Sequence, residues 1–307
     1  MALGTFPIVG LCSTRHGNVP WARAGTLRGA PRLCILPLMQ GWPWPIDPLP
    51  ARAVVVGAHP DDEVIGAGAL LARLPDAAVV HVTDGAPRNE SDARAAGFAG
   101  WTEYAAARRG EAEAALAVAG LAPERLIGFG IADQQAAHNL APLAQRLAAL
   151  LREGGFAVVI THAYEGGHPD HDATALAVHA ACRLIEGAGQ APPRLVEMAG
   201  YHALGGSFTA GTFIAHAEAG PVATVALDAK ARRLKRRMLD CHATQRAVLA
   251  PFAVQVERFR AAPGYDFRIP PHPGTLHYDT RNWGITGEHW RRLAQAALEQ
   301  LRLACPL

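Results

Sequence analysis

The feature that most constrains the fold is an alternation of short apolar runs with helical patterns, which begins near Ala51. The apolar runs predict strands at residues 54–56, 78–82, 125–129, 156–161 and 195–199. Helical patterns occupy residues 64–74, 101–119, 140–152 and 170–185. Such alternation indicates βαβ units. The expected fold class is α/β, a Rossmann-like, doubly wound, mostly parallel sheet with helices on both faces.

The last third of the chain predicts a small C-terminal extension of this sheet. Residues 213–216 and 222–227 have the character of short strands, and residues 230–240 and 288–301 that of helices. The segment 230–240 is rich in basic side chains, which we interpret as a solvated amphipathic face. These are Arg232, Arg233, Lys235, Arg236 and Arg237.

Residues 1–50 differ from the rest because they show no sustained periodicity and contain many helix and strand breakers. We interpret them as a disordered or loosely attached leader. The alternative is a strap in which Trp42 and Trp44 cover an apolar patch. Residues 51–307 are expected to form a single domain.

Composition excludes several classes of protein. Half of the 307 residues are hydrophobic, as in a globular protein, and the net charge of +2 gives no field that would attract nucleic acid. No apolar run approaches the ~20 residues of a membrane-spanning helix. The cysteines form no CxxC pair, so we expect a reduced, cytoplasmic protein. They are Cys12, Cys34, Cys182, Cys241 and Cys305.

Polar side chains follow the first predicted strand in the stretch Ala58-His59-Pro60-Asp61-Asp62-Glu63. Close packing of so many ionisable groups is unfavourable unless a cation or a proton-transfer role offsets their repulsion. At the start of a helix, His59 and Asp62 would lie on the same side, whereas Asp61 would project differently.

A second polar cluster, His168-Pro169-Asp170-His171, follows the fourth predicted strand. Proline suits the first position of a helix, so His168 would cap that helix and His171 would lie on its first turn. The first and fourth strands are neighbours in many doubly wound sheets, and ligands bind beyond the carboxyl ends of such strands. The two clusters are therefore expected to meet and bind a metal ion.

The pair of motifs AHPDDE and HPDH resembles the PIG-L/LmbE family of zinc-dependent N-deacetylases, which act on N-acetylglucosamine-type sugars. The resemblance covers roughly residues 51–245. It implies that His59, Asp62 and His171 are the metal ligands. It further implies that Asp61 is the general base and that His168 stabilises the oxyanion or acts as an acid.

The chemistry of these residue types agrees with the implied roles. A site of two histidines and one carboxylate leaves positions open for water and substrate, as in catalytic zinc sites, although Fe(II) also accepts such ligands. Asp170 is expected either to orient a histidine from outside the ligand set or to cap the helix.

Substrate contacts are expected from three further residues. Arg88 lies on a turn-rich loop after the second strand, where an arginine can bind sugar hydroxyls or remain a turn residue. Asp133 resembles the sugar-contacting acid of the family. The mycothiol-pathway members have a tyrosine near the site where this chain has Gly166-Gly167 immediately before His168, and Tyr164 is the candidate to replace it.

The function expected from the sequence is therefore hydrolysis of the N-acetyl group of an N-acetylglucosamine-type sugar or conjugate, with zinc as cofactor. The expected partner is this small-molecule substrate, without nucleic acid or membrane span, and a homo-oligomer is compatible with the sequence. One alternative is a metal-dependent amidase or esterase for another acylated small molecule. Another is a non-catalytic sugar-binding module. A nucleotide-binding Rossmann domain is disfavoured because no GxGxxG follows the first strand.

Overall fold

The computed structural model describes residues 49–307, and a seven-stranded sheet runs through this part of the chain. The strand order is β3-β2-β1-β4-β5-β9-β8. The strands are β1 (Ala53–Gly57), β2 (Ala78–Thr83), β3 (Leu126–Ile131), β4 (Val158–His162), β5 (Arg194–Met198), β8 (Ala223–Ala226) and β9 (Val256–Ala261). A separate small sheet pairs β6 (Tyr201–His202) with β7 (Thr209–Ala210).

The strands β1 to β5 are parallel, and β9 and β8 extend the sheet through antiparallel pairing. Because β1 lies between β2 and β4, the chain reverses its direction of travel across the sheet at the β1/β4 boundary. The expected doubly wound, mostly parallel fold is thus confirmed, including the neighbouring positions of the first and fourth strands. A crevice at the carboxyl ends of β1 and β4 follows from this topology.

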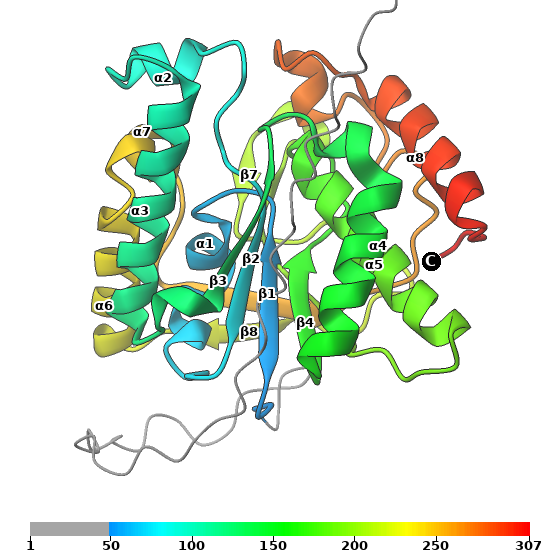
Figure 1. Ribbon diagram of the computed structural model, residues 1–307, viewed down its shortest axis with the longest axis horizontal. Helices are drawn as coiled ribbons and strands as arrows, with labels where there is room; N and C mark the ends of the chain where they lie inside the picture. Colours follow the sequence, from blue (N-terminus) through cyan, green and yellow to red (C-terminus); the bar gives the residue numbers. More distant parts are fainter. Residues whose placement is uncertain (1–48) are drawn as a thin grey trace, which may run out of the picture. The chain divides into compact units, whose positions relative to one another are not determined.

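Helices cover both faces of the sheet (Figure 1). The α-helices are α1 (Asp62–Leu71), α2 (Ser91–Ala95), α3 (Trp101–Ala119), α4 (Leu140–Gly154), α5 (Pro169–Gly187), α6 (Ala229–Asp240), α7 (Arg246–Leu249) and α8 (Gly287–Leu301). Short 3-10 turns occupy Pro123–Arg125, Ala136–Asn139, Leu204–Gly206, Ala243–Gln245 and His277–Thr280.

The hydrophobic core is divided into two layers by the sheet. Alternate residues of β1 point to opposite faces, so Val54 and Val56 pack with α4, α5 and α8, whereas Val55 packs with α1 and α3. Gly66 on α1 permits a close approach, because a Cβ atom there would overlap the side chain of Met198 on β5. Continuous burial of both faces explains the apolar runs in the parallel strands.

Helix α1 is interrupted at Ala67, whose backbone is not helical (φ −142°, ψ 19°). Two charged side chains satisfy the backbone groups near this break. Glu257 of β9 accepts the N–H groups of Ala69 and Leu70 at 2.7 and 3.1 Å. Lys235 of α6 donates to the Ile65 carbonyl at 2.7 Å and to Glu257 at 2.9 Å.

The structure corrects three local expectations. Lys235 is buried rather than part of a solvated face, because it pairs with Glu257. Residues 213–216 do not form a strand; instead Arg260 of β9 donates to the Ile214 carbonyl. The strand β9, which supplies Arg260, was not expected from the sequence at all.

The predicted leader, residues 1–50, lies outside the described residues except for its last two positions. Its structure and the predicted domain boundary therefore stay predictions. Within residues 49–307, no helix has both the length and the apolar character needed to cross a membrane.

Candidate metal centre and active site

The two polar motifs meet at the carboxyl ends of β1 and β4. Val56 of β1 is in register with Thr161 of β4, so the loops that follow these strands start side by side. The N–H of Ala58 donates to Nε2 of His162 at 3.0 Å and joins the two loops directly. Gly167 allows the second loop to fold tightly, because a Cβ atom there would overlap the Tyr201 carbonyl oxygen.

His59, Asp62 and His171 form a compact set of buried donor atoms, which we call the triad. Nδ1 of His59 lies 3.3 Å from Nε2 of His171 and 3.3 Å from Oδ2 of Asp62. Oδ1 of Asp62 lies 3.2 Å from Nε2 of His171. Ligand atoms of a tetrahedral zinc site, at about 2.0–2.1 Å from the ion, are about 3.3 Å apart. The triad thus has the donor types and spacing of such a site.

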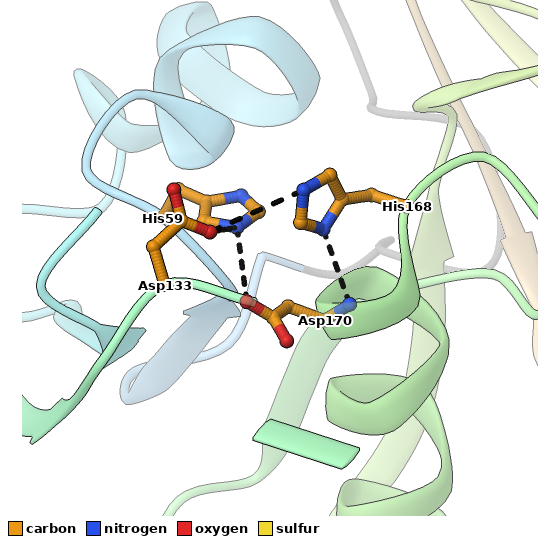
Figure 2. Close-up of side chains that lie close together, drawn as sticks. All are labelled: His59, Asp133, His168 and Asp170. Atoms are coloured by element: carbon orange, nitrogen blue, oxygen red, sulfur yellow. Dashed lines mark hydrogen bonds and ion pairs between the residues drawn. The ribbon is translucent and has the colours of Figure 1, made fainter. Parts of the chain in front are cut away.

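The opposite side of the His59 ring is held by two carboxylates (Figure 2). Nε2 of His59 lies 3.1 Å from Asp133 Oδ1 and 3.5 Å from Asp170 Oδ2. Asp170 is itself fixed, because it accepts the N–H groups of Gln134 and Ala136 at 2.6 and 3.0 Å. A carboxylate on one imidazole nitrogen orients the other nitrogen toward a metal.

These contacts also set the charges around the triad. Burial is the largest influence on His59 and opposes its charged form. The charge of Asp133 and the hydrogen bonds to Asp133, Asp170 and Asp62 together outweigh burial and raise the pKa of His59 well above its usual value. Burial likewise opposes ionisation of Asp133 and Asp62. The histidines beside them nevertheless hold the pKa of each carboxyl below its usual value. These two carboxyl groups, Asp62 and Asp133, are therefore favoured in their ionised form.

A second group of donor atoms, His59, Asp133, His168 and Asp170, also lies within metal-binding distance. It uses the Nε2 side of His59. Both oxygens of Asp170 already accept backbone N–H groups, which leaves this carboxylate less free to bind an ion. The triad is the better candidate for the metal centre.

Asp61 lines the pocket beside the triad but belongs to neither donor group. Its backbone adopts φ 139°, a region that non-glycine residues rarely occupy. Glu63 Oε2 accepts the Asp61 N–H at 3.2 Å, and also the Nε2 hydrogen of His81 at 2.8 Å. Burial raises the pKa of Asp61 to about 7, although the charge of Arg108 opposes this shift.

Arg108 of α3 holds the Asp61 carboxylate in place. Its Nη2 donates to Asp61 Oδ2 and to the Pro60 carbonyl, both at 2.9 Å. Its Nη1 donates to the Gly85 carbonyl at 2.6 Å. The guanidinium thus connects the loops after β1 and β2 and presents the carboxylate to the pocket.

His168 is the N-cap residue of α5, as expected, and Pro169 occupies the first helical position. Nδ1 of His168 accepts the Asp170 N–H at 3.1 Å, which leaves the ring hydrogen of the neutral form on Nε2. Burial, together with the charge of His59, lowers the pKa of His168 well below its usual value. His168 is therefore a neutral donor whose Nε2 lies 4.0 Å from Asp133 Oδ1.

A pocket of about 420 Å³ opens over the triad and is lined by Asp61, Arg108, Asp133 and His168. Tyr201, Phe208, Val248, Phe252 and Trp283 add apolar surface to it. The predicted site residues from the two motifs are thus gathered in one place, with Asp133 beside them.

Two predicted substrate contacts lie elsewhere. Tyr164 is buried in the core, where it donates to the Ile269 carbonyl at 2.9 Å and stacks on Trp290. Arg88 pairs with Asp84 at 2.6 Å and lies over the Trp101 ring, outside the lining of the pocket. Tyr164 and Arg88 thus lie outside the lining of the pocket, and their contacts with substrate stay predictions.

Two buried residues near the site were not singled out from the sequence. Arg108 lies on the apolar stripe of α3 with Tyr104 and Ala112. A charged residue at this helical spacing from apolar residues indicates, from the sequence alone, a charge that is buried in the fold. His162 is the last residue of the buried strand β4, and its ring stacks on that of His171 with ring centres 4.0 Å apart.

The fold and the site together define a class of protein: a Rossmann-like α/β domain with a buried histidine and carboxylate centre at its switch point. Within this class, residues 54–182 match the family model described as PIG-L, GlcNAc-PI de-N-acetylase. The resemblance to this family that was inferred from the two motifs is thus confirmed over these residues. No curated protein matches the chain.

Solved structures share the fold. A teicoplanin deacetylase, described as a zinc-inhibited form, aligns with 68% of this chain and 97% of its own at 19% identity and a TM-score of 0.53. A deacetylase of the A40926 pseudoaglycone aligns with 69% of this chain and 96% of its own at 22% identity and a TM-score of 0.53. At these identities the likeness concerns the fold.

Proposed function

We propose that this protein is a zinc-dependent hydrolase that removes the N-acetyl group of an N-acetylglucosamine-type sugar or conjugate. The observation that carries the proposal is the joint placement of the triad, Asp61 and His168 around one pocket. The PIG-L family description, a de-N-acetylase, and the deacetylase activities named for the two solved structures support it.

His59, Asp62 and His171 would hold the ion. Two imidazoles and one carboxylate suit zinc, and Fe(II) accepts the same donors. When bound, the ion would polarise the amide carbonyl and lower the pKa of water toward about 7. Asp133 and Asp170 would keep the ring of His59 oriented through its other nitrogen.

Asp61 is proposed as the general base. Its carboxylate lines the pocket, and Arg108 fixes its direction without removing it from the pocket surface. It would take a proton from the attacking water and return that proton to the nitrogen of the departing amine. The free sugar amine and acetate are then the products.

His168 is proposed to stabilise the charge that develops on the former carbonyl oxygen. Because Nδ1 accepts a backbone N–H, the Nε2 hydrogen is available to donate into the pocket. A fixed donor of this type contributes roughly 10²–10³-fold to rate in other hydrolases. The interaction does not require a charged imidazolium.

The direct test is release of primary amine from a panel of N-acetylated sugars, together with metal analysis of the purified protein. We expect stoichiometric metal and turnover in the native chain. Asp61→Asn should keep the metal and lose about 10²–10⁴-fold in kcat, whereas Asp62→Asn should lose the metal as well. Asp76→Asn is a matched control, because Asp76 pairs with Arg125 on the surface.

Three results would contradict the proposal. The first is full activity of metal-depleted protein or of metal-loaded Asp61→Asn. The second is release of product only from acylated compounds that are not sugars, which would indicate another amidase or esterase. The third is sugar binding without turnover by the metal-loaded native protein, which would indicate a binding module.

A further inference from the structure

Asp61 has an unusual conformation for a residue at the start of a helix. It is the N-cap residue of α1, and most N-cap residues have an extended backbone and a side chain that accepts an N–H group of the first turn. Asp61 instead has φ 139° and ψ −25°, and its side chain accepts no such group. The carboxylate faces the pocket and accepts from Arg108. The direction of the proposed base therefore depends on a backbone conformation that aspartate does not favour.

A rare backbone conformation persists where neighbouring groups hold it in place. The Asp61 carbonyl accepts the N–H groups of Val64 and Ile65 at 2.9 and 3.0 Å, which fixes one end of the residue on α1. Glu63 fixes the other end, because its Oε2 accepts the Asp61 N–H at 3.2 Å. Arg108 thus acts on the side chain of Asp61, whereas Glu63 acts on its backbone.

His81 of β2 holds the Glu63 carboxylate. Nε2 of His81 donates to Glu63 Oε2 at 2.8 Å, and both side chains are buried. His81 is itself fixed in the sheet, where it is in register with Gly57 of β1 and Gly128 of β3. A chain of hydrogen bonds therefore leads from the sheet through His81 and Glu63 to the backbone of Asp61.

Stability alone does not account for a carboxylate at position 63. An acid gains modestly from the dipole at the start of a helix, whereas full burial of its charge costs much more. In a capping box the N-cap side chain would return the contact, but that of Asp61 does not. Oε1 of Glu63 accepts no hydrogen bond within residues 49–307. Apolar residues in place of a buried polar pair are often as stable or more stable.

We propose that Glu63, held by His81, is a positioning residue for the reaction: it keeps the Asp61 backbone in the conformation that directs the carboxylate into the pocket. The inference rests on the proposed role of Asp61 as general base. It assigns to Glu63 a task that neither binds the metal nor contacts the substrate. The metal site should be independent of it, because the Asp62 carboxylate is held by the His59 N–H at 2.7 Å.

The test compares Glu63→Met, which has a similar length but no acceptor, with Glu63→Gln, whose amide oxygen can accept both hydrogen bonds. We expect metal-loaded Glu63→Met to lose about 10–100-fold in kcat with little change in KM, because the base is displaced. Glu63→Gln should stay within about threefold of the native kcat, since the acceptor is kept. Leu70→Ala, which leaves a cavity at the buried far end of α1, is the control that loses stability without losing kcat.

A double variant separates positioning from stability. Glu63→Met leaves the His81 Nε2 hydrogen without an acceptor, and Glu63→Met/His81→Leu removes this unpaired group. The double variant should therefore melt at a higher temperature than Glu63→Met, because no buried donor remains unpaired. Its kcat should nevertheless stay as low as that of Glu63→Met. Recovery of kcat together with the melting temperature would overturn the proposal.

Three other results would also overturn the proposal. The first is native kcat in Glu63→Met. The second is an equal loss of kcat in Glu63→Gln and Glu63→Met, which would exclude the hydrogen-bond acceptor as the cause. The third is loss of the metal from Glu63→Met, which would assign Glu63 to the metal site instead.

Crystal structures of the variants give a readout that does not depend on turnover. In Glu63→Met the Asp61 carboxylate should move by on the order of 1 Å, a displacement large enough to affect a reacting group, whereas in Glu63→Gln it should not move. If this movement is observed but no N-acetylated sugar is deacetylated by the native protein, the proposed reaction fails while the positioning of Asp61 by Glu63 stands. An unmoved Asp61 in Glu63→Met would refute the positioning role.

Discussion

The guanidinium of Arg108 donates a 2.9 Å hydrogen bond to Oδ2 of Asp61, and both side chains are buried. Two further hydrogen bonds, to the carbonyls of Pro60 and Gly85, fix the guanidinium itself. The direction of the proposed base is therefore determined by a residue on α3, far from both motifs in the sequence.

We predict that Arg108→Gln lowers kcat by about 10–100-fold while the metal content is retained, because small displacements of a reacting group have effects of that size. Arg108→Lys should be intermediate, since lysine keeps the charge but not the planar fork. Arg109→Gln is the control on the same helix, as Arg109 pairs with Glu113 on the surface. Stopped assays with metal analysis would check this, and loss of metal in Arg108→Gln would contradict the positioning role.

Removal of the metal should lower stability. A ligand that binds only the folded protein stabilises it by about 4 kcal/mol at a thousand times its dissociation constant. Thermal unfolding with and without a chelator should therefore show a lower melting temperature for the stripped protein, restored by added zinc. His171→Ala should remove the response to zinc, whereas His289→Ala, a half-buried position on the first turn of α8 outside the pocket, should keep it. A zinc response that survives in His171→Ala would contradict the assignment of the triad.

The buried carboxyl groups near Arg260 should make stability depend on pH. Burial raises the pKa of Glu165 from 4.5 to about 8, and the neighbouring Glu197 adds to this shift against the charge of Arg260. The folded protein thus retains a proton that the unfolded chain loses near pH 4.5. Stability is then greatest below pH 4.5 for this group, and it is lost as the pH rises toward about 8.

Glu165→Gln should remove this dependence, because glutamine can accept the Ile214 N–H without a charge. We expect the free energy of unfolding of the native protein to fall by about 1–3 kcal/mol more than that of the variant between pH 5 and pH 8. Denaturant titrations at several pH values would measure it, with the exposed Glu299→Gln as control. Parallel pH profiles for the native protein and Glu165→Gln would refute the prediction.

The ion pair of Lys235 and Glu257 should be important for stability, because it satisfies the backbone at the break in α1. Lys235→Met leaves a buried carboxylate without its cation, and we expect the free energy of unfolding to fall by about 3–5 kcal/mol. The double variant Lys235→Met/Glu257→Gln should recover part of this loss. Lys230→Met, at an exposed position of α6, should have little effect. Chemical denaturation of the four proteins would decide, and equal stability of Lys235→Met and Lys230→Met would exclude the proposed role.

The parallel half of the sheet could be predicted from the sequence because its strands are apolar on both faces. Strand β9 could not, since it carries Glu257 and Arg260, which are buried only because Lys235, Glu197 and other groups pair with them. Charged residues in a short run normally predict a loop. Glu257 and Arg260 can nevertheless lie in a buried strand because of their charged partners, and these partners are more than 20 residues away in the sequence.

The candidate site likewise contains residues whose positions could be predicted from the sequence and residues whose positions could not. Residues within the two motifs could be placed together because strand topology brings the carboxyl ends of β1 and β4 to one edge. Tyr164 could not be placed, because its direction depends on packing against Trp290 and Phe267 from the C-terminal region. The burial of Arg108 could have been predicted from its position on the apolar stripe of α3. Its hydrogen bond to Asp61 could not.

The hydrogen bond from Ala58 to His162 joins residues that are 104 positions apart, and the triad is divided between the segments that follow β1 and β4. During folding, the donor atoms of His59 and Asp62 cannot meet His171 until β4 has docked against β1. Pairing of such distant strands is a slow, entropically demanding step. We therefore expect uptake of the metal to follow the closing of the sheet, so that zinc capture reports on completion of the fold rather than starting it.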